Sequence, residues 1–174
     1  VWTYYKSDLI ALVDRLDKDA ALAREYDAAI SGQTGIACFD AWASELVATG
    51  YLHNHARMWF ASIWIFTLQL PWQLGAYFFY RHLLEGDPAS NTCSWRWVAG
   101  LHTVGKTYLA RADNIEKFTA GRFAPQGQLA RTANALEDPR PVSVTAPKYV
   151  NPDLAGRRVG LLVTEEDAHP ESLA

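Results

Sequence analysis

Three charged side chains border a long uncharged stretch of the sequence. Arg57 precedes 23 uncharged residues, 58 to 80, and Glu85 and Asp87 follow them. A charge that folding removes from water needs a partner, so we expect the arginine to pair with one of these acids at the edge of an apolar pocket. Such a pocket suits a flat aromatic cofactor. An ion pair that only holds two helices together would explain the same residues.

His53 and His55 are the other residues whose type could do chemistry, as metal ligands or in a nuclease. Residues two apart on a helix do not face each other, so the two imidazoles are not expected to chelate one ion. No Asp, Glu or Cys stands nearby at the spacing of a metal ligand set. We therefore predict no metal site.

The elements that must position these residues are predicted to be helices. Apolar residues recur at helical spacing in residues 9–16, and residues 20–30 are rich in alanine, so residues 1–31 are predicted to form a helical flank without chemistry. A third helix is predicted to end at Gly50, because apolar side chains follow the i, i+3, i+4 pattern before it. These side chains are Phe39, Trp42, Ala43, Leu46 and Val47.

The uncharged stretch is long enough for a membrane span, which needs about 20 apolar residues. However, polar side chains and Pro71 interrupt it. We therefore predict two buried helices, over residues 53–69 and 71–84, with Pro71 at the corner between them, and no membrane span. Asp87 is predicted to cap a further helix that starts at Pro88, and a short helix is predicted over residues 114–119.

The end of the chain differs in composition from the rest. Five of the eight prolines fall between Pro125 and Pro152, which is typical of an extended linker. Residues 159–164 form a short apolar run typical of a strand. We predict an all-α fold, an irregular multi-helix bundle over residues 1–123, followed by a Pro-rich linker and strand-like tail over residues 124–174.

Composition limits the possible classes of function. The 174 residues carry a net charge of −3, which gives no global case for nucleic-acid binding. Residues 96–131 hold six basic and two acidic residues, a local excess that is typical of a solvated face. With only two cysteines and no secretory signal, a cytoplasmic location is predicted. The chain is expected to be a piece of a longer protein, and its oligomeric state is not indicated.

A series of short motifs resembles the helical flavin domain of the DNA photolyase and cryptochrome family. The resemblance covers about residues 31–123 and implies an all-α domain of the photolyase FAD-binding type, with FAD as the cofactor. The motifs follow the family's order and spacing: Thr34-Gly35, Asp40-Ala41, Thr49-Gly50-Tyr51, His53-Asn54, Arg57-Met58, Ala61-Ser62, Trp72, Gly86-Asp87, Ala89, Asn91 and Trp95-x-Trp97.

The resemblance implies a cofactor-binding set. Asn54 and Arg57 would lie against the isoalloxazine ring, with Arg57 paired to Glu85. Asp87 would meet the polar edge of the flavin. Asn91 would sit beside the reactive ring nitrogen, where the side chain tunes flavin protonation and redox state. An arginine and an amide near the ring would stabilise its anionic reduced form.

It also implies roles in catalysis and substrate binding. Trp95 and Trp72 match the inner and middle members of an electron relay that photoreduces the flavin, and together with Asn91 they form the predicted catalytic set. Met58 and Trp97 match residues that contact a flipped-out pyrimidine dimer, and stacking on Trp97 suits such a base. His55 stands where the family commonly has an arginine that contacts DNA phosphate.

Two parts of the family's pattern are missing. The antenna domain and the Ser/Thr-rich loop that holds the FAD phosphates do not occur in this sequence, so the domain is expected to be truncated at its N-terminus. The outer tryptophan of the relay, expected near Asp19, is absent, so Trp42 or a tyrosine would have to replace it.

The leading hypothesis is the flavin-binding portion of a deoxyribodipyrimidine photolyase-type lyase. In the full-length protein, it would transfer an electron from light-excited reduced flavin to pyrimidine dimers in damaged DNA; this piece alone is expected to be inactive. The alternatives are a cryptochrome-like blue-light sensor and a degenerate, non-catalytic helical interaction module.

Overall fold

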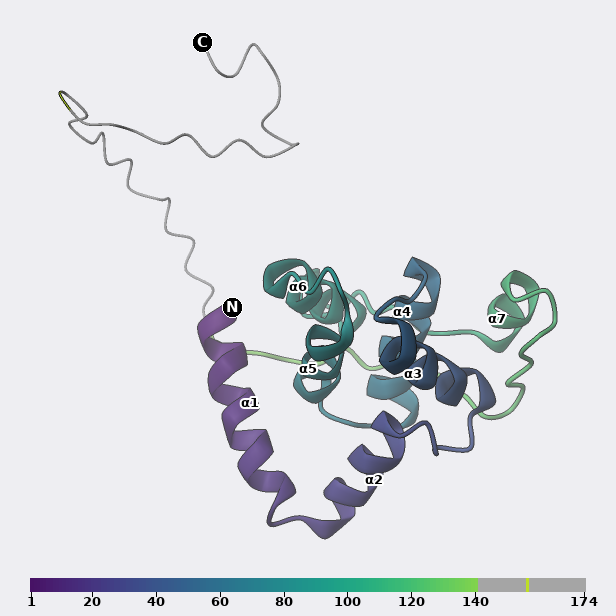
Figure 1. Cartoon of the computed structure of the whole chain (residues 1–174), viewed down its shortest axis with the longest axis horizontal. Coiled ribbons are helices and arrows are strands. Elements are labelled where there is room, and N and C mark those ends of the chain that lie inside the picture. The colour runs from purple at the N-terminus through teal and green to yellow at the C-terminus, as the bar shows by residue number, and fades with distance from the viewer. Residues whose placement is uncertain (141–155, 157–174) are drawn as a thin grey trace. The chain divides into compact units, whose positions relative to one another are not determined.

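The computed structural model describes residues 1–140 and residue 156, and its regular elements there are all helical (Figure 1). This confirms the predicted all-α class. Residues 1–140 form one compact unit. The predicted strand at residues 159–164 lies outside the described residues, as does the part of the Pro-rich stretch after Arg140.

The first two helices form the predicted flank. They are α1 (Trp2–Leu16) and α2 (Ala20–Ile30), and the side chain of Asp19 caps α2 by accepting a hydrogen bond from the Leu22 N–H at 3.1 Å. The face of α1 that meets the core carries Tyr5, Leu9, Leu12 and Leu16. Ile10 and Val13, which the apolar pattern also included, are exposed, because they lie one position off this face.

Helix α3 (Ala37–Thr49) ends at Gly50, as predicted, and Gly50 lies in the left-handed region with φ +69°. Four of its five predicted core residues are buried, and Val47 is exposed. A Cβ atom on residue 50 would come within 2.7 Å of the Leu84 side chain. Glycine is therefore required there by conformation and by space.

The uncharged stretch forms two buried helices around a Pro corner, as predicted. Helix α4 (Asn54–Ser62) continues into a π-helical turn, η1 (Ile63–Thr67), and α5 (Trp72–His82) begins directly after Pro71. The first helix begins one residue later than predicted, since His53 is its N-cap. Among the residues the structure describes, no helix has the length and hydrophobicity needed to cross a membrane.

Helix α6 (Pro88–Val98) starts at Pro88 with Asp87 as its cap, as predicted, because the Asp87 carboxylate accepts a hydrogen bond from the Ser90 N–H. The short helix α7 (Ala112–Phe118) begins two residues earlier than predicted. Aromatic rings from α4, η1, α5 and α6 form the centre of the core. Trp95 contacts the rings of Phe60, Trp64 and Phe79 there.

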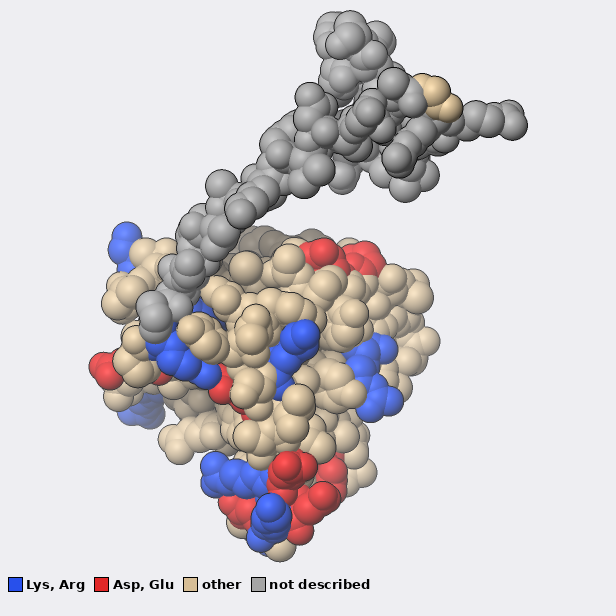
Figure 2. Space-filling model, turned by 90° about the vertical axis from the view of Figure 1, so that its left-hand side faces the viewer, with Lys and Arg blue, Asp and Glu red and all other residues tan. Residues whose placement is uncertain are grey.

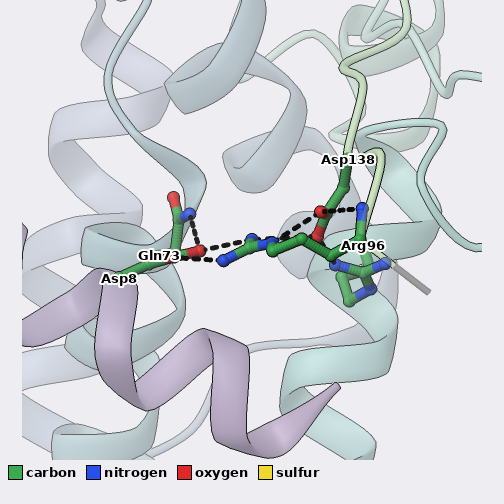
Figure 3. Close-up of polar contacts among 5 residues, drawn as sticks. Asp8, Gln73, Arg96 and Asp138 are labelled. Atoms are coloured by element: carbon green, nitrogen blue, oxygen red, sulfur yellow. Dashed lines mark hydrogen bonds and ion pairs between the residues drawn. The ribbon is translucent and has the colours of Figure 1, made fainter. Parts of the chain in front are cut away.

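The chain from Pro125 to Arg140 has no helix and is fastened to the helical unit. The Leu136 N–H donates to the Ala99 carbonyl at 2.9 Å. Arg140 pairs with Asp8 of α1 and with Asp138, and Asp138 also pairs with Arg96 of α6. Figure 3 shows this network, which joins the segment to α1 and α6.

On the face shown in Figure 2, Lys and Arg side chains are scattered among uncharged residues, and at one end they are mixed with acids. This distribution fits the small net charge of the sequence.

Candidate functional site

A cavity of about 510 Å³ is lined by residues of α4, α5 and α6 and of the α5–α6 connection. Its volume falls within the range of about 300–1,000 Å³ that is usual for ligand sites. Eight of the ten site residues predicted from the sequence line it: Asn54, Arg57, Met58, Glu85, Asp87, Asn91, Trp95 and Trp97. The fold therefore brings the predicted cofactor side and substrate side into one cavity.

The ion pair predicted for Arg57 is present, and Glu85 is its partner. The Arg57 Nε–H also donates to the Leu52 carbonyl at 2.7 Å, which fixes the guanidinium from the side opposite to solvent. The hydrogen bond from Arg57 lowers the pKa of the Glu85 carboxyl below its usual range. Arg57 therefore lies at the cavity wall in a fixed orientation. Its partner Glu85 is half-exposed, so the acid neutralises the charge of Arg57 only in part.

Asp87 and Asn91 are on the cavity side of α6. Asp87 is held by its capping bond to the first turn of the helix. The Asn91 side-chain N–H donates to the Ala76 carbonyl of α5 at 2.7 Å. This bond uses one of the two N–H donors of the amide, and the carbonyl oxygen, which can only accept a hydrogen bond, remains available to a ligand in the cavity.

Trp95 forms a buried wall of the cavity. Its indole N–H is buried and has no hydrogen-bond partner among the described residues, the only side-chain polar atom there of which this is true. Leaving a buried donor unpaired costs about 1–3 kcal/mol. The aromatic wall of the cavity, together with Arg57 and Asn91, fits a flavin ring.

Trp97 and Met58 also line the cavity. Trp97 is 40% exposed, and its ring stacks on Tyr108 with centroids 5.7 Å apart. The Asn54 amide approaches the sulfur of Met58 at 3.9 Å. An exposed indole supported from behind by a second aromatic ring can stack against an aromatic ligand from solution.

His55 and Trp72 do not line this cavity. His55 borders a second, smaller cavity together with His53, Trp59 and Phe118. The expectation that His53 and His55 do not face each other is wrong, since their rings stack with centroids 5.5 Å apart. The reason is that His53 caps α4 from outside the helix, so helical geometry does not apply to it. Trp72 is buried on α5 against Tyr5 and Arg96.

The prediction from sequence missed several lining residues on the same helices. Ser90, Ser94 and Val98 lie on the face of α6 that Asn91 and Trp95 define. Helical spacing from Asn91 could have identified them. Phe79 of α5, Leu83 directly after it, the exposed Cys93 and His102 also line the cavity. No pattern in the sequence singles these four out.

Comparison with known proteins agrees with this geometry. Residues 4–133 match the family described as the FAD binding domain of DNA photolyase. The deoxyribodipyrimidine photo-lyase of Streptomyces griseus is 42% identical over 113 residues, covering 58% of this chain and 25% of that protein. The deoxyribodipyrimidine photo-lyase of Thermus thermophilus is 42% identical over 111 residues, which cover 64% of this chain and 25% of that protein.

A cryptochrome is also similar. Cryptochrome-1 of Arabidopsis thaliana is 35% identical over 100 residues, which cover 58% of this chain and 14% of the relative. The matched part thus spans no more than a quarter of any of these three relatives. No solved structure matches the chain. The family match covers most of the chain, and the chain belongs to the family of FAD-binding domains of DNA photolyases.

Proposed function

We propose that the chain is the flavin-binding portion of a light-driven DNA repair enzyme that splits pyrimidine dimers. The observation that supports this most is the single cavity, in which the residues assigned to the flavin and those assigned to the damaged base line the same space. An electron donor and its acceptor must be close, and one cavity provides this. The relatives named photo-lyases support the same activity for the full-length protein.

On the flavin side, Arg57 and Asn54 would lie against the ring, with Glu85 holding Arg57 in position. Asp87 would meet the polar edge of the ring. The oriented carbonyl oxygen of Asn91 would accept a hydrogen bond from a protonated ring nitrogen, which favours the reduced form of the flavin. FAD supplies the light absorption and the one-electron chemistry when bound, and these residues supply its position and electrostatics.

On the substrate side, Met58 and Trp97 would contact a base taken out of the duplex. The cost of unstacking a base, a few kcal/mol, is smallest for a damaged one. Trp97 offers an exposed stacking surface supported by Tyr108. His55 lies at the second cavity, so a contact from His55 to DNA would be made outside the pocket.

A blue-light sensor of the cryptochrome type is the second candidate. It is supported by the similarity to cryptochrome-1 and by His55, an imidazole where a permanently charged arginine would hold DNA phosphate more firmly. The same flavin pocket would serve both functions.

We infer a cytoplasmic location, since both Cys38 and Cys93 are free thiols.

Absorption spectroscopy tests the cofactor, and a repair assay separates the two functions. The chain is incubated with FAD, freed of excess cofactor and scanned; Arg57→Ala serves as the matched control with a damaged pocket. Flavin bands that stay with the parent chain and not with the variant support the site, and their absence from both contradicts it. The full-length protein with reduced flavin is then given a dimer-containing oligonucleotide under blue light. Repair of the dimer supports the proposed repair enzyme. A dimer that stays unchanged contradicts it and leaves the blue-light sensor as the remaining function.

A further inference from the structure

One side of α1 carries a stripe of exposed side chains that the core does not use. Lys6, Ile10, Val13 and Asp17 follow one another at intervals of four, three and four residues, so they lie along one side of the helix. These intervals are those of the seam of a coiled coil. Ile10 is 66% exposed, Val13 is 44% exposed, and both charged residues are exposed as well. We call these four residues the α1 stripe.

The α1 stripe is separate from the contacts that hold α1 in the fold. Helix α1 lies at the edge of the helical unit and packs on the other helices through a different side (Figure 1). Trp2, one turn before Lys6, continues the stripe and is 40% exposed. Single exposed apolar side chains are common on protein surfaces, but several in a row on an exposed helix face are typical of a binding surface.

Lys6 and Asp17 place opposite charges at the two ends of the apolar pair. Among the described residues, neither of the two forms an ion pair. Arg15, on another side of the same helix, pairs with Asp19. The α1 stripe therefore has a base at one end, an acid at the other end and an apolar centre between them.

We propose that the α1 stripe binds the same stripe of a second copy of this chain, with the two helices antiparallel. Positions 10 and 13 have the same midpoint as positions 6 and 17. A two-fold axis through that midpoint sets Ile10 against Val13 of the second copy. The same axis sets Lys6 against Asp17 of the second copy, and by symmetry each contact occurs twice. Apolar side chains thus meet apolar ones, and bases meet acids.

The charges also select the antiparallel arrangement over the parallel one. In a parallel pair the same positions of the two copies meet, so that Lys6 would face Lys6 and Asp17 would face Asp17. Like charges at such contacts repel each other. The antiparallel arrangement, by contrast, sets the N-terminus of each helix beside the C-terminus of the other, which the helix dipoles favour.

The length of the α1 stripe determines the strength that we expect. From Lys6 to Asp17 the helix advances about 16 Å, at about 1.5 Å per residue. A stable interface buries about 800 Å² on each partner, and so short a stripe provides less. We therefore expect a reversible dimer with a dissociation constant in the micromolar range. The stripe residues do not line the cavity between α4, α5 and α6, so the proposal does not rest on the flavin function.

Sedimentation velocity over a range of protein concentrations tests the dimer. The average mass of the chain should rise with concentration toward twice that of the monomer. Val13→Glu places a charge at the apolar centre of the stripe and should weaken association roughly tenfold or more. The matched control is Val104→Glu, which makes the same change at a valine that is 91% exposed and lies after α6, and it should leave association unchanged. Circular dichroism confirms that each variant is folded.

Charge reversal tests the antiparallel arrangement. Lys6→Glu and Asp17→Lys each set like charges against each other at two places in the dimer, and each should weaken association roughly 3- to 10-fold. The double variant exchanges the two charges and should restore the association of the parent chain. Lys18→Glu, at an exposed lysine off the stripe, is the control for the change in net charge.

Three results would overturn the proposal. The first is a chain that stays monomeric at every concentration. The second is an association that Val13→Glu leaves unchanged, because the contact would then lie on another surface. The third is a double charge variant that associates no better than the single ones, because the two helices would then meet in another arrangement. Failure of the chain to bind FAD does not affect any of these measurements.

Discussion

The indole ring of Trp95 lies directly on the backbone of Gly75, so that a Cβ atom on residue 75 would come within 2.3 Å of the ring. The glycine is inside α5, where alanine is otherwise the better helix former by about 1 kcal/mol. Its small size therefore serves the contact between α5 and α6, which places Trp95 at the cavity wall.

Gly75→Ala should destabilise the chain in spite of the gain in helix propensity. The new methyl group must displace a fully buried ring, and overpacking of this kind costs about 1–3 kcal/mol. Chemical denaturation measures the change in unfolding free energy. The control is the same substitution in a Trp95→Leu background, where alanine should cost less, because only the Trp64 ring, at 3.0 Å, then remains close to the new methyl group. A similar loss in both backgrounds would mean that the Trp95 ring is not the cause.

Arg57→Ala should weaken FAD binding by roughly 10- to 100-fold, because a hydrogen bond to a charged group contributes about 1.5–3 kcal/mol. Asp87→Ala should also weaken it, and Trp97→Ala should do so less, since Trp97 is assigned to the substrate side. Flavin fluorescence titration gives the dissociation constants. Arg81→Ala is the matched control, because Arg81 lies outside the cavity against Tyr77. Release of flavin by Trp97→Ala alone would contradict the assignment.

Asp138→Asn should lower stability at pH 7 and have little effect near pH 2. Its pKa is lowered from 3.8 to about 2, mainly by the hydrogen bond from Arg140. A depressed pKa stabilises the fold above the unfolded value and loses this contribution as pH falls from about 4 to 2. The shift corresponds to at most about 2.5 kcal/mol. Urea denaturation at several pH values measures it.

The control for this pH dependence is Asp113→Asn, which removes an exposed pair with Arg111 and should change stability little at any pH. A loss for Asp138→Asn that is equal at pH 7 and pH 2 would show that its charge is not what holds residues 125–140 to the helices.

Ser62→Ala should destabilise the fold by about 1–3 kcal/mol, since it leaves a buried donor without a partner. The Ser62 hydroxyl oxygen accepts a hydrogen bond from the Ala110 N–H at 2.7 Å, and both residues are buried. Ser44→Ala, at an exposed serine of α3, should stay within about 0.5 kcal/mol of the parent. Thermal unfolding of the two variants side by side makes the comparison. Equal melting temperatures would contradict the role of Ser62.

Much of the local structure follows from the sequence because its causes are local. Asp87 and Pro88 start α6 by capping and by a fixed φ, and Gly50 ends α3 through its left-handed conformation. The pair between Arg57 and Glu85 was predictable because few other charges are available to either. The exposed Val47 was predicted incorrectly, because an apolar pattern indicates a face but not how widely the neighbouring helices cover it.

The sequence by itself thus determined the helical class, the positions of most helices and eight of the residues that line the cavity between α4, α5 and α6. Only the tertiary structure decided how these residues are oriented and which distant side chains join them. The Asn91 amide is turned by a carbonyl of another helix, and Trp72 is linked to the surface by rings from α1, some 70 residues earlier in the chain. Such relationships depend on how the helices pack, and spacing along one helix cannot reveal them.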